Sequence, residues 1–185
     1  MRLNIFQAKT IFTIKVTENL QLRLATTADS PQIWTMLQDA IEQRRLDGSQ
    51  QWQNGYPNQQ TVVDDIALKN SYVFLYNNNI VACGVIIFGE DTNYKTIDGD
   101  WLTNGKYAAI HRVATSNDFK GKGIATQLFL EIEDFCKSKK TPSIRVDTNF
   151  DNIPMLKILK KLDYQYCGEI FFNNAFRKAF EKVLR

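Results

Sequence analysis

The 185-residue sequence predicts one domain of the α/β class, in which helices cover a mixed sheet. Two observations support this fold class. A composition of 44% hydrophobic and 12% aromatic residues suits a single packed core. Stretches with strand and helix periodicity follow one another in the order β, α, α, β, β, β, α, β, α, β, β. We place the domain at residues 21–185, and residues 1–20 form an N-terminal extension that is either an added strand or a loose arm.

The first predicted strand, residues 20–26, alternates leucine with polar residues, as a half-buried strand does. A helix should follow, because Ser30 suits a cap and Pro31 suits the first helical turn. The residues expected to face the core from this helix are Ile33, Leu37, Ala40 and Ile41.

Residues 47–60 form a polar loop that carries Trp52 and Tyr56. Aromatic side chains in such a loop either contact a ligand or anchor the loop to the core, and we take these two as candidate substrate contacts. Thr61 to Asp64 then resembles a capping box that opens a short helix. Its expected inward residues are Val62, Val63, Ile66 and Ala67.

Residues 71–76 and 80–88 are typical of a hairpin, because the asparagines between them tolerate the positive φ angles of a tight turn. The polar connection that follows, residues 89–106, is long and rich in acids, which favours a place in a functional site. Its four acids are Glu90, Asp91, Asp98 and Asp100.

The second half of the chain predicts strands at 107–115 and 143–150, each followed by a helix, and then an antiparallel pair at 164–172 and 176–184. The first of these helices has an apolar stripe at Ile124, Leu128, Ile132 and Phe135. The second has Met155, Ile158, Leu159 and Leu162 directed inward.

Charge and composition exclude several classes of function. Lysine and arginine exceed aspartate and glutamate by only three, 23 against 20, so we expect neither nucleic acid nor membrane as a partner. No apolar stretch approaches the ~20 residues of a membrane span, and we expect a soluble cytoplasmic protein. Its three cysteines form no C-x-x-C pair, and a single histidine excludes multi-histidine metal sites, so we expect no metal.

The turn between strand 107–115 and the next helix has the chemistry of an anion site. Free N–H groups at a helix start attract an anion, and glycines at 121 and 123 let a phosphate approach the backbone. Lys120 and Lys122 add positive charge. The third glycine of a dinucleotide-binding fingerprint is absent, as is a Walker sequence, and a plain loop is the alternative at this level.

The segment KGKGIA, residues 120–125, closely resembles the coenzyme A signature of the GNAT superfamily of N-acetyltransferases, with Lys120 where glutamine or arginine is usual. The later segment 146–164 resembles the strand and helix in which that family's asparagine contacts pantetheine, here Asn152. The resemblance covers roughly residues 21–184. It implies a mostly antiparallel central sheet flanked by about four helices, and acetyl-CoA as cofactor.

From this resemblance we expect a set of cofactor-binding residues. They are Val113, Thr115, Lys120, Gly121, Lys122, Gly123, Ile124, Ala125, Thr126 and Asn152. The acceptor would be the primary amine of a small molecule or peptide, which the sequence does not identify. The oligomeric state is equally open, a homodimer included.

Acetyl transfer to an amine needs a base, because an amine resembling lysine has a pKa near ~10.4 and is protonated at neutral pH. His111 is our candidate, since some family members carry a histidine at the matching strand position, and Asp147 is the alternative base or amine-binding carboxylate. Strand alternation predicts that His111, Val113 and Thr115 share one face. A backbone N–H near Val113 to Thr115 is expected to polarise the thioester carbonyl.

The family's tyrosine that protonates the leaving thiolate corresponds here to Leu159, which periodicity assigns to the core. Tyr164, Tyr166 and Cys167 are possible substitutes for that acid. Two other functions stay open: a noncatalytic module that binds acyl-CoA, and an acyltransferase that uses Cys83 or Cys167 as nucleophile.

Overall fold

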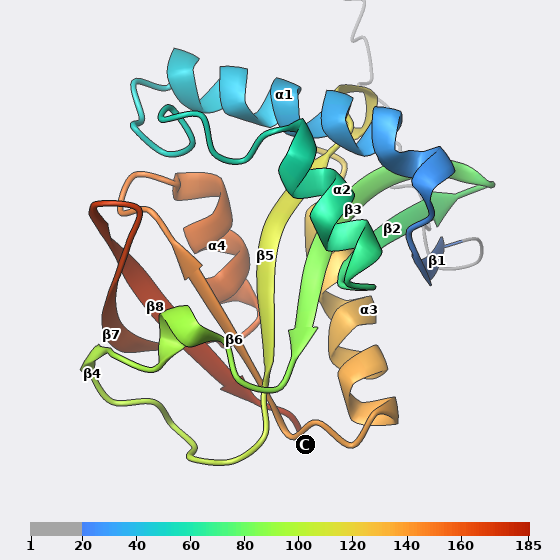
Figure 1. The fold of residues 1–185 in the computed structure, drawn as a ribbon. Coiled ribbons are helices and arrows are strands. Elements are labelled where there is room, and N and C mark those ends of the chain that lie inside the picture. Colours follow the sequence, from blue (N-terminus) through green and yellow to red (C-terminus); the bar gives the residue numbers. More distant parts are fainter. Residues whose placement is uncertain (1–19) are drawn as a thin grey trace, which may run out of the picture.

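The structure is a computed structural model that describes residues 20–185. An eight-stranded sheet forms its centre, in the order β1-β2-β3-β5-β6-β8-β7-β4 (Figure 1). Among the strand pairs of residues 20–185, only β5–β6 is parallel. The strands are β1 Leu20–Leu24, β2 Ser71–Tyr76, β3 Asn79–Phe88, β4 Asp98–Gly99, β5 Ala108–Thr115, β6 Ser143–Thr148, β7 Gln165–Phe172 and β8 Ala175–Val183. The predicted mixed, mostly antiparallel sheet is therefore confirmed.

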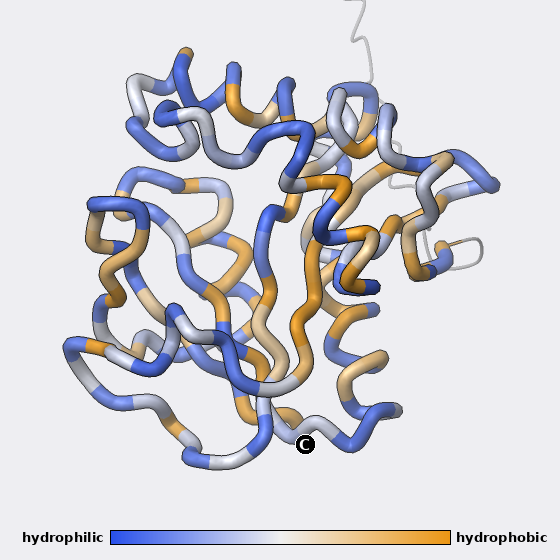
Figure 2. The backbone as a smooth tube through the Cα atoms, viewed as in Figure 1, coloured by the Kyte–Doolittle hydropathy of each residue, from blue (hydrophilic) through white to orange (hydrophobic). Residues whose placement is uncertain are grey.

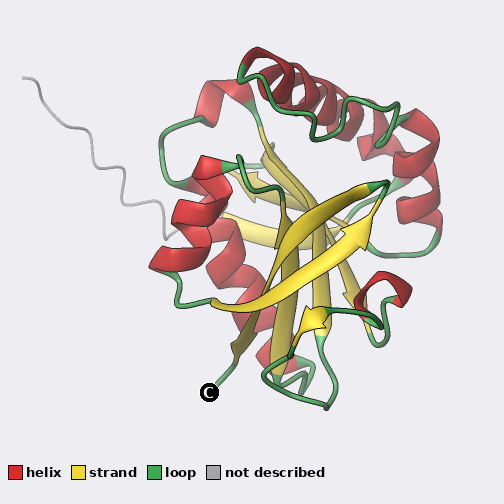
Figure 3. Ribbon diagram, turned by 90° about the vertical axis from the view of Figure 1, so that its left-hand side faces the viewer, coloured by secondary structure: helices red, strands yellow, loops and turns green. Residues whose placement is uncertain are grey.

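Helices cover both faces of this sheet (Figure 3). They are α1 Ser30–Leu46, α2 Gln59–Ala67, α3 Ile124–Ser138 and α4 Ile153–Lys161. Adjacent residues of β2 lie on opposite faces of the sheet: Val73 packs with α1 and α2, and Phe74 packs with α3 and α4. Figure 2 shows that hydrophobic residues concentrate in the central strands and hydrophilic ones in the outer loops. None of the helices in the described part of the chain is long and apolar enough to cross a membrane.

The sheet divides between β5 and β6. These strands pair only from Ala108 opposite Ile144 to Ile110 opposite Val146, although they continue to Thr115 and Thr148. Beyond the last pair the two strands diverge toward α1, as Figure 1 shows. One edge of β5 therefore loses its partner strand there, while its other edge remains paired with β3.

A bulge in β5 contradicts the predicted strand alternation. The pairing with β3 shifts register between Cys83 and Val85, and Arg112 has a φ of 50°. An extra residue in one strand reverses the side-chain pattern beyond it. Val113 accordingly packs on the α3 face and Ala114 on the α1 face. The prediction that His111 and Val113 share a face is wrong.

Most other predicted elements are confirmed, with corrections at the helix starts. Helix α2 begins at Gln59 with Asn58 as its cap, because Asn58 Oδ1 accepts a hydrogen bond of 3.0 Å from the Thr61 N–H. Only one side of this short helix meets the sheet, so Val62 and Ile66 are buried while Val63 and Ala67 are exposed. The cap of α1 is Asp29, and Ser30 is the first helical residue.

The predicted hairpin is present, and its turn residues Asn77 and Asn78 have φ angles of 48° and 63°. The C-terminal strands β7 and β8 pair antiparallel as expected. Leu20 begins β1, and the rest of the predicted N-terminal extension, 1–19, lies outside the described residues.

Candidate functional site

Two cavities meet where β5 and β6 diverge. The central cavity has a volume of about 370 Å³, and the outer groove has a volume of about 550 Å³. Four residues line both the central cavity and the outer groove: Trp52, Val113, Asn152 and Met155. A ligand in the groove could therefore extend one end into the cavity.

The outer groove is lined by the α3 start, the end of β5, α4 and the C-terminal half of α1. All but one of the residues expected to bind the cofactor line it: Val113, Thr115, Lys120, Gly121, Gly123, Ile124, Ala125, Thr126 and Asn152. The exception is Lys122, whose Nζ lies 5.1 Å from the ring centroid of Phe119 and which lines neither cavity.

The turn before α3 offers a cradle for an anion. Gly121 and Gly123 have φ angles of 73° and 81°, and a Cβ added to either would meet no heavy atom within 4 Å. No backbone carbonyl of the described residues accepts a hydrogen bond from the N–H groups of Ile124, Ala125 or Thr126. These donors and the positive end of the helix suit a phosphate or pyrophosphate.

Asn152 has a structural role as well as a place in both linings. Its Oδ1 accepts from the Met155 N–H at 3.3 Å and so caps α4. Its Nδ2 donates to Gln51 Oε1 at 3.0 Å, and the neighbouring Asp151 accepts from Ser49 at 2.9 Å. These two bonds tie the α1–α2 loop to the start of α4 across the divided sheet.

His111 and Asp147 are the first residues beyond the last β5–β6 pair, and they face each other. His111 Nδ1 lies 3.5 Å from Asp147 Oδ1, and His111 Nε2 lies 2.7 Å from Asp91 Oδ2. Asp147 also accepts from the Tyr94 hydroxyl at 2.7 Å and from Arg177 at 3.2 Å. The structure thus brings both predicted catalytic residues together, within a network that the sequence did not reveal.

This network alters the acidity of its members. Burial lowers the pKa of His111, but hydrogen bonds and charges from Asp147 and Asp91 outweigh burial, so the pKa is raised overall. Burial acts in the opposite direction on Asp147, and His111, Arg177 and Tyr94 nonetheless lower the pKa of this carboxyl to about 2. The cluster consequently favours a protonated imidazole between two carboxylates.

A second polar group closes the α2 side of the central cavity. Arg112 donates to Asp65 through Nε at 2.7 Å and Nη2 at 2.6 Å, and through Nη1 to the Tyr56 hydroxyl. Burial raises the pKa of Asp65 despite this ion pair. All three guanidinium nitrogens of Arg112 donate hydrogen bonds, and these bonds fix the side chain at the bulge of β5.

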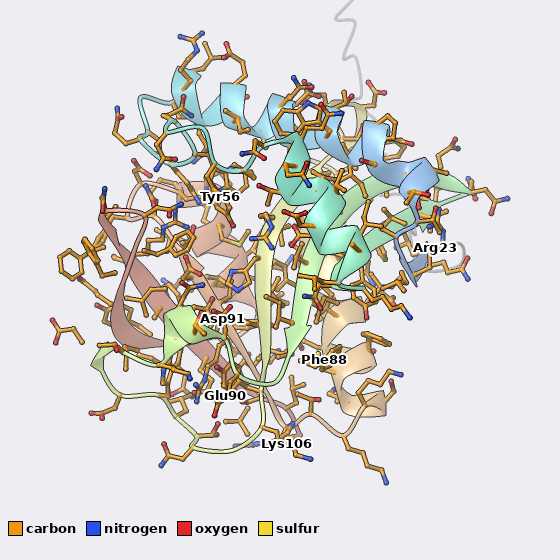
Figure 4. All side chains as sticks on the ribbon, in the orientation of Figure 1. Arg23, Tyr56, Phe88, Glu90, Asp91 and Lys106 are labelled. Atoms are coloured by element: carbon orange, nitrogen blue, oxygen red, sulfur yellow. The ribbon has the colours of Figure 1, made fainter. Side chains whose placement is uncertain are left out.

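The two aromatic residues of the α1–α2 loop line the cavities. Trp52 lines both cavities, and Tyr56 lines the central cavity. Figure 4 shows Tyr56 above Asp91, both beside β5, with Glu90 next to Asp91. The Tyr56 ring also makes an edge contact with Phe172 of β7, with centroids 5.6 Å apart. These aromatics both wall the cavity and anchor the loop.

The residue of α4 at the position of the usual acid packs in the core. Leu159 is fully buried in the core, and it is Met155 and Ile158 that face the groove. The suggested substitutes Tyr164, Tyr166 and Cys167 line neither cavity. Burial raises the pKa of Cys83 to about 12, so this thiol does not supply a nucleophilic thiolate near neutral pH.

Sequence reasoning missed Arg112 and Arg177 and did not single out Asp91. The signal for Asp91 was present, since it lies in the long acidic connection 89–106 that was expected to join a site. Arg177 lies on β8 and reaches the cavity only through the pairing of β8 with β6. No local pattern in the sequence predicts that arrangement.

Comparison with known proteins supplies a family. The sequence profile of the acetyltransferase (GNAT) family matches residues 34–164. A GNAT family acetyltransferase from Streptococcus agalactiae is similar in structure, with 33% identity, a TM-score of 0.83, and coverage of 90% of this chain and 96% of that chain. No curated protein matches the sequence.

More distant solved structures share the fold. A GNAT family acetyltransferase from Listeria monocytogenes is 20% identical with a TM-score of 0.71, covering 89% of this chain and 95% of its own. The NatC complex bound to Gag peptide and CoA has a chain that is 12% identical with a TM-score of 0.63, covering 90% and 99%.

Proposed function

Because the chain belongs to the acetyltransferase (GNAT) family, we propose that it moves an acetyl group from acetyl-CoA to a primary amine by direct transfer in a ternary complex. The observation that carries this proposal is the junction of the outer groove with the central cavity at Trp52, Val113, Asn152 and Met155. A thioester and an amine entering from the two sides would meet there.

The outer groove fits coenzyme A by its chemistry. The free N–H groups of Ile124, Ala125 and Thr126 and the open backbone at Gly121 and Gly123 suit the pyrophosphate. Asn152 and the apolar Met155 and Ile158 would lie along the pantetheine arm. The NatC structure, which has the same fold, is bound to CoA.

Acetyl-CoA supplies an activated acetyl group, and the chain must bind, orient and deprotonate the amine. We assign the proton acceptor to the neutral form of His111; Asp91 and Asp147 raise its pKa, so the imidazolium must lose a proton before it can act as the base. Both ring nitrogens of His111 face carboxylates. The incoming ammonium would therefore displace one of these two carboxylates from the imidazole. The N–H groups on the unpaired edge of β5 beyond Ile110 are suited to polarise the acetyl carbonyl.

A side chain that protonates the leaving thiolate is not required for this reaction. The pKa of a free thiol is about 8.5, so coenzyme A leaves readily as a thiolate near neutral pH. The burial of Leu159 and the distance of the tyrosine candidates from the cavities are compatible with departure into the solvent-open groove.

The test is an amine screen with acetyl-CoA that follows thiol release and identifies the acetylated product by mass. We expect thiol release that depends on the amine and a product heavier by one acetyl group. The His111→Gln variant should lose about 10²- to 10⁴-fold in kcat while retaining CoA affinity, because it lacks only the proton acceptor. Thiol release that is independent of every amine would refute transfer to an amine.

A further inference from the structure

The central cavity contains two buried guanidinium groups, and they differ in how fully they are used. Arg112 donates through all three nitrogens, to Asp65 and Tyr56. The side chain of Arg177 is as little exposed, 10% against 11% for Arg112, yet it makes one hydrogen bond with the described residues, from Nη1 to Asp147 at 3.2 Å. The Nε of Arg177 is buried without an acceptor. Of the two guanidinium groups in this cavity, Arg177 is therefore the one with unmet donors.

The compensation of the Arg177 charge is also incomplete. Asp147, its ion-pair partner, is shared with the Tyr94 hydroxyl at 2.7 Å and with His111 at 3.5 Å. The guanidinium lies over the ring of Phe172, with its central carbon 4.7 Å from the centroid, and this contact fixes its plane. A fixed, buried guanidinium with free N–H groups matches the geometry of a carboxylate.

The position of Arg177 limits the length of the ligand. Arg177 and His111 contact the two different oxygens of one carboxyl group, that of Asp147. The site that would hold an anion and the site that would deprotonate an amine are thus about one carboxyl group apart. A ligand that reaches both must carry its amine and its carboxylate only a few bonds from each other.

We propose that the acceptor is a free amino acid, whose carboxylate binds Arg177 while its amino group faces His111. This inference rests on the proposed acetyltransferase function. The paired charges of the cavity, Arg112 with Asp65 and Arg177 with Asp147, leave it suited to a zwitterion. Tyr56 and Phe172 form an aromatic wall beside the same site.

The experiment compares matched acceptors. Each common amino acid is offered beside its α-amide and its decarboxylated amine, with acetyl-CoA as donor. We expect kcat/KM for the free acid to exceed that for both analogues by about ten- to a hundredfold, the effect of a lost hydrogen-bonded charge. The amine pKa is near ~8 in an α-amide and near ~10.4 in an alkyl amine, so the two analogues bracket the amine pKa of the free amino acid. A preference for the free acid over both analogues is therefore not explained by amine basicity.

Variants assign the preference to a residue. Arg177→Gln should bring the ratio of kcat/KM for the free acid to kcat/KM for the amine close to one. If the substitution merely disturbed Asp147 and His111, kcat/KM would fall equally for both substrates and the ratio would not change. Arg177→Lys should retain part of the preference, because it keeps the charge and loses the planar fork. The matched control is Arg23→Gln, which removes a guanidinium paired with Asp29 on the far side of the molecule (Figure 4) and should leave the ratio unchanged.

The outcomes separate the two proposals. If amines are acetylated equally well with and without a carboxylate, or if Arg177→Gln keeps the wild-type ratio, the amino-acid inference is overturned and the acetyltransferase function stands. If a decarboxylated polyamine is the best acceptor, the inference is likewise overturned. If no amine is acetylated, the proposed function fails and this inference fails with it.

Discussion

His111 sits between two carboxylates, and this position determines how activity should vary with pH. The pKa of His111 is raised overall, and only the neutral imidazole accepts a proton. Activity should therefore rise as the pH increases through this raised pKa. Replacing Asp91 with Asn removes one negative charge at 2.7 Å from Nε2, so the pKa should fall and the acidic limb should move to lower pH.

The measurement is the pH profile of kcat for wild type and Asp91→Asn with one acceptor, so that titration of the acceptor contributes equally to both. Asp98→Asn is the control, because Asp98 is an exposed acid of the same connection and lines neither cavity. An acidic limb that stays in place in Asp91→Asn, or moves equally in Asp98→Asn, would argue against His111 as the base.

Asp65 has a structural role, because its carboxylate compensates the buried charge of Arg112. Its two oxygens accept from Nε and Nη2, and the side chains of both residues are about nine-tenths buried. Asp65→Ala would leave that guanidinium without its partner and should reduce the free energy of unfolding by about 3–5 kcal/mol. Urea denaturation measures this loss.

The neighbouring Asp64→Ala provides a matched control in the same helix. Asp64 is exposed, and among the described residues its carboxylate accepts only from Gln60, so its replacement should change stability by no more than about 0.5 kcal/mol. Equal stability of the two variants would show that Arg112 does not depend on Asp65.

At the scale of elements, the start of α3 tests the anion cradle. Gly123 is the N-cap of this helix with a φ of 81°, and its backbone is open to the groove. Gly123→Ala should cost about 1–2 kcal/mol of stability because of the left-handed backbone. It should also weaken CoA binding by about ten- to a hundredfold, because the added Cβ obstructs the approach of a phosphate to the N–H groups.

Gly48 separates these two effects. It has a φ of 75°, with no heavy atom within 4 Å of an added Cβ, but it lines neither cavity. Gly48→Ala should therefore lose similar stability and keep wild-type affinity for CoA, as measured by calorimetric titration. A Gly123→Ala variant that binds CoA as tightly as Gly48→Ala would exclude the cradle as the phosphate site.

The elements also show which features sequence reasoning could reach. The groove residues from Val113 to Thr126 are nearly contiguous, so the glycine turn at a helix start, together with the resemblance of this stretch to a coenzyme A signature, was enough to predict them. The start of α2 was missed because Asn58 and Thr61 are both good caps, and the choice depends on which N–H each one meets. Periodicity placed Val63 inward although α2 meets the sheet along a narrower face.

The central cavity needed tertiary information. The positive φ of Arg112 is supported by contacts with Asp65 and Tyr56, which lie 47 and 56 residues away in the chain. Asp91 and Arg177 approach His111 and Asp147 from a connection and from β8. Such convergence from four separate segments has no periodic signature in the sequence.

For the whole molecule, the divided sheet implies that a bound cofactor stabilises the fold globally. Three residue pairs join β5 to β6, and the outer groove lies between α3 on one side of the division and α4 on the other. At a hundredfold excess over its Kd, a ligand of the native state adds about 2.7 kcal/mol to the free energy of unfolding. For a domain of this size Tm should rise by about 5–10 °C.

Thermal unfolding with acetyl-CoA, CoA, NAD and ATP measures this effect, and we expect a rise in Tm with acetyl-CoA and CoA alone. An unchanged Tm with both CoA compounds, or an equal rise with NAD or ATP, would contradict a groove built for coenzyme A.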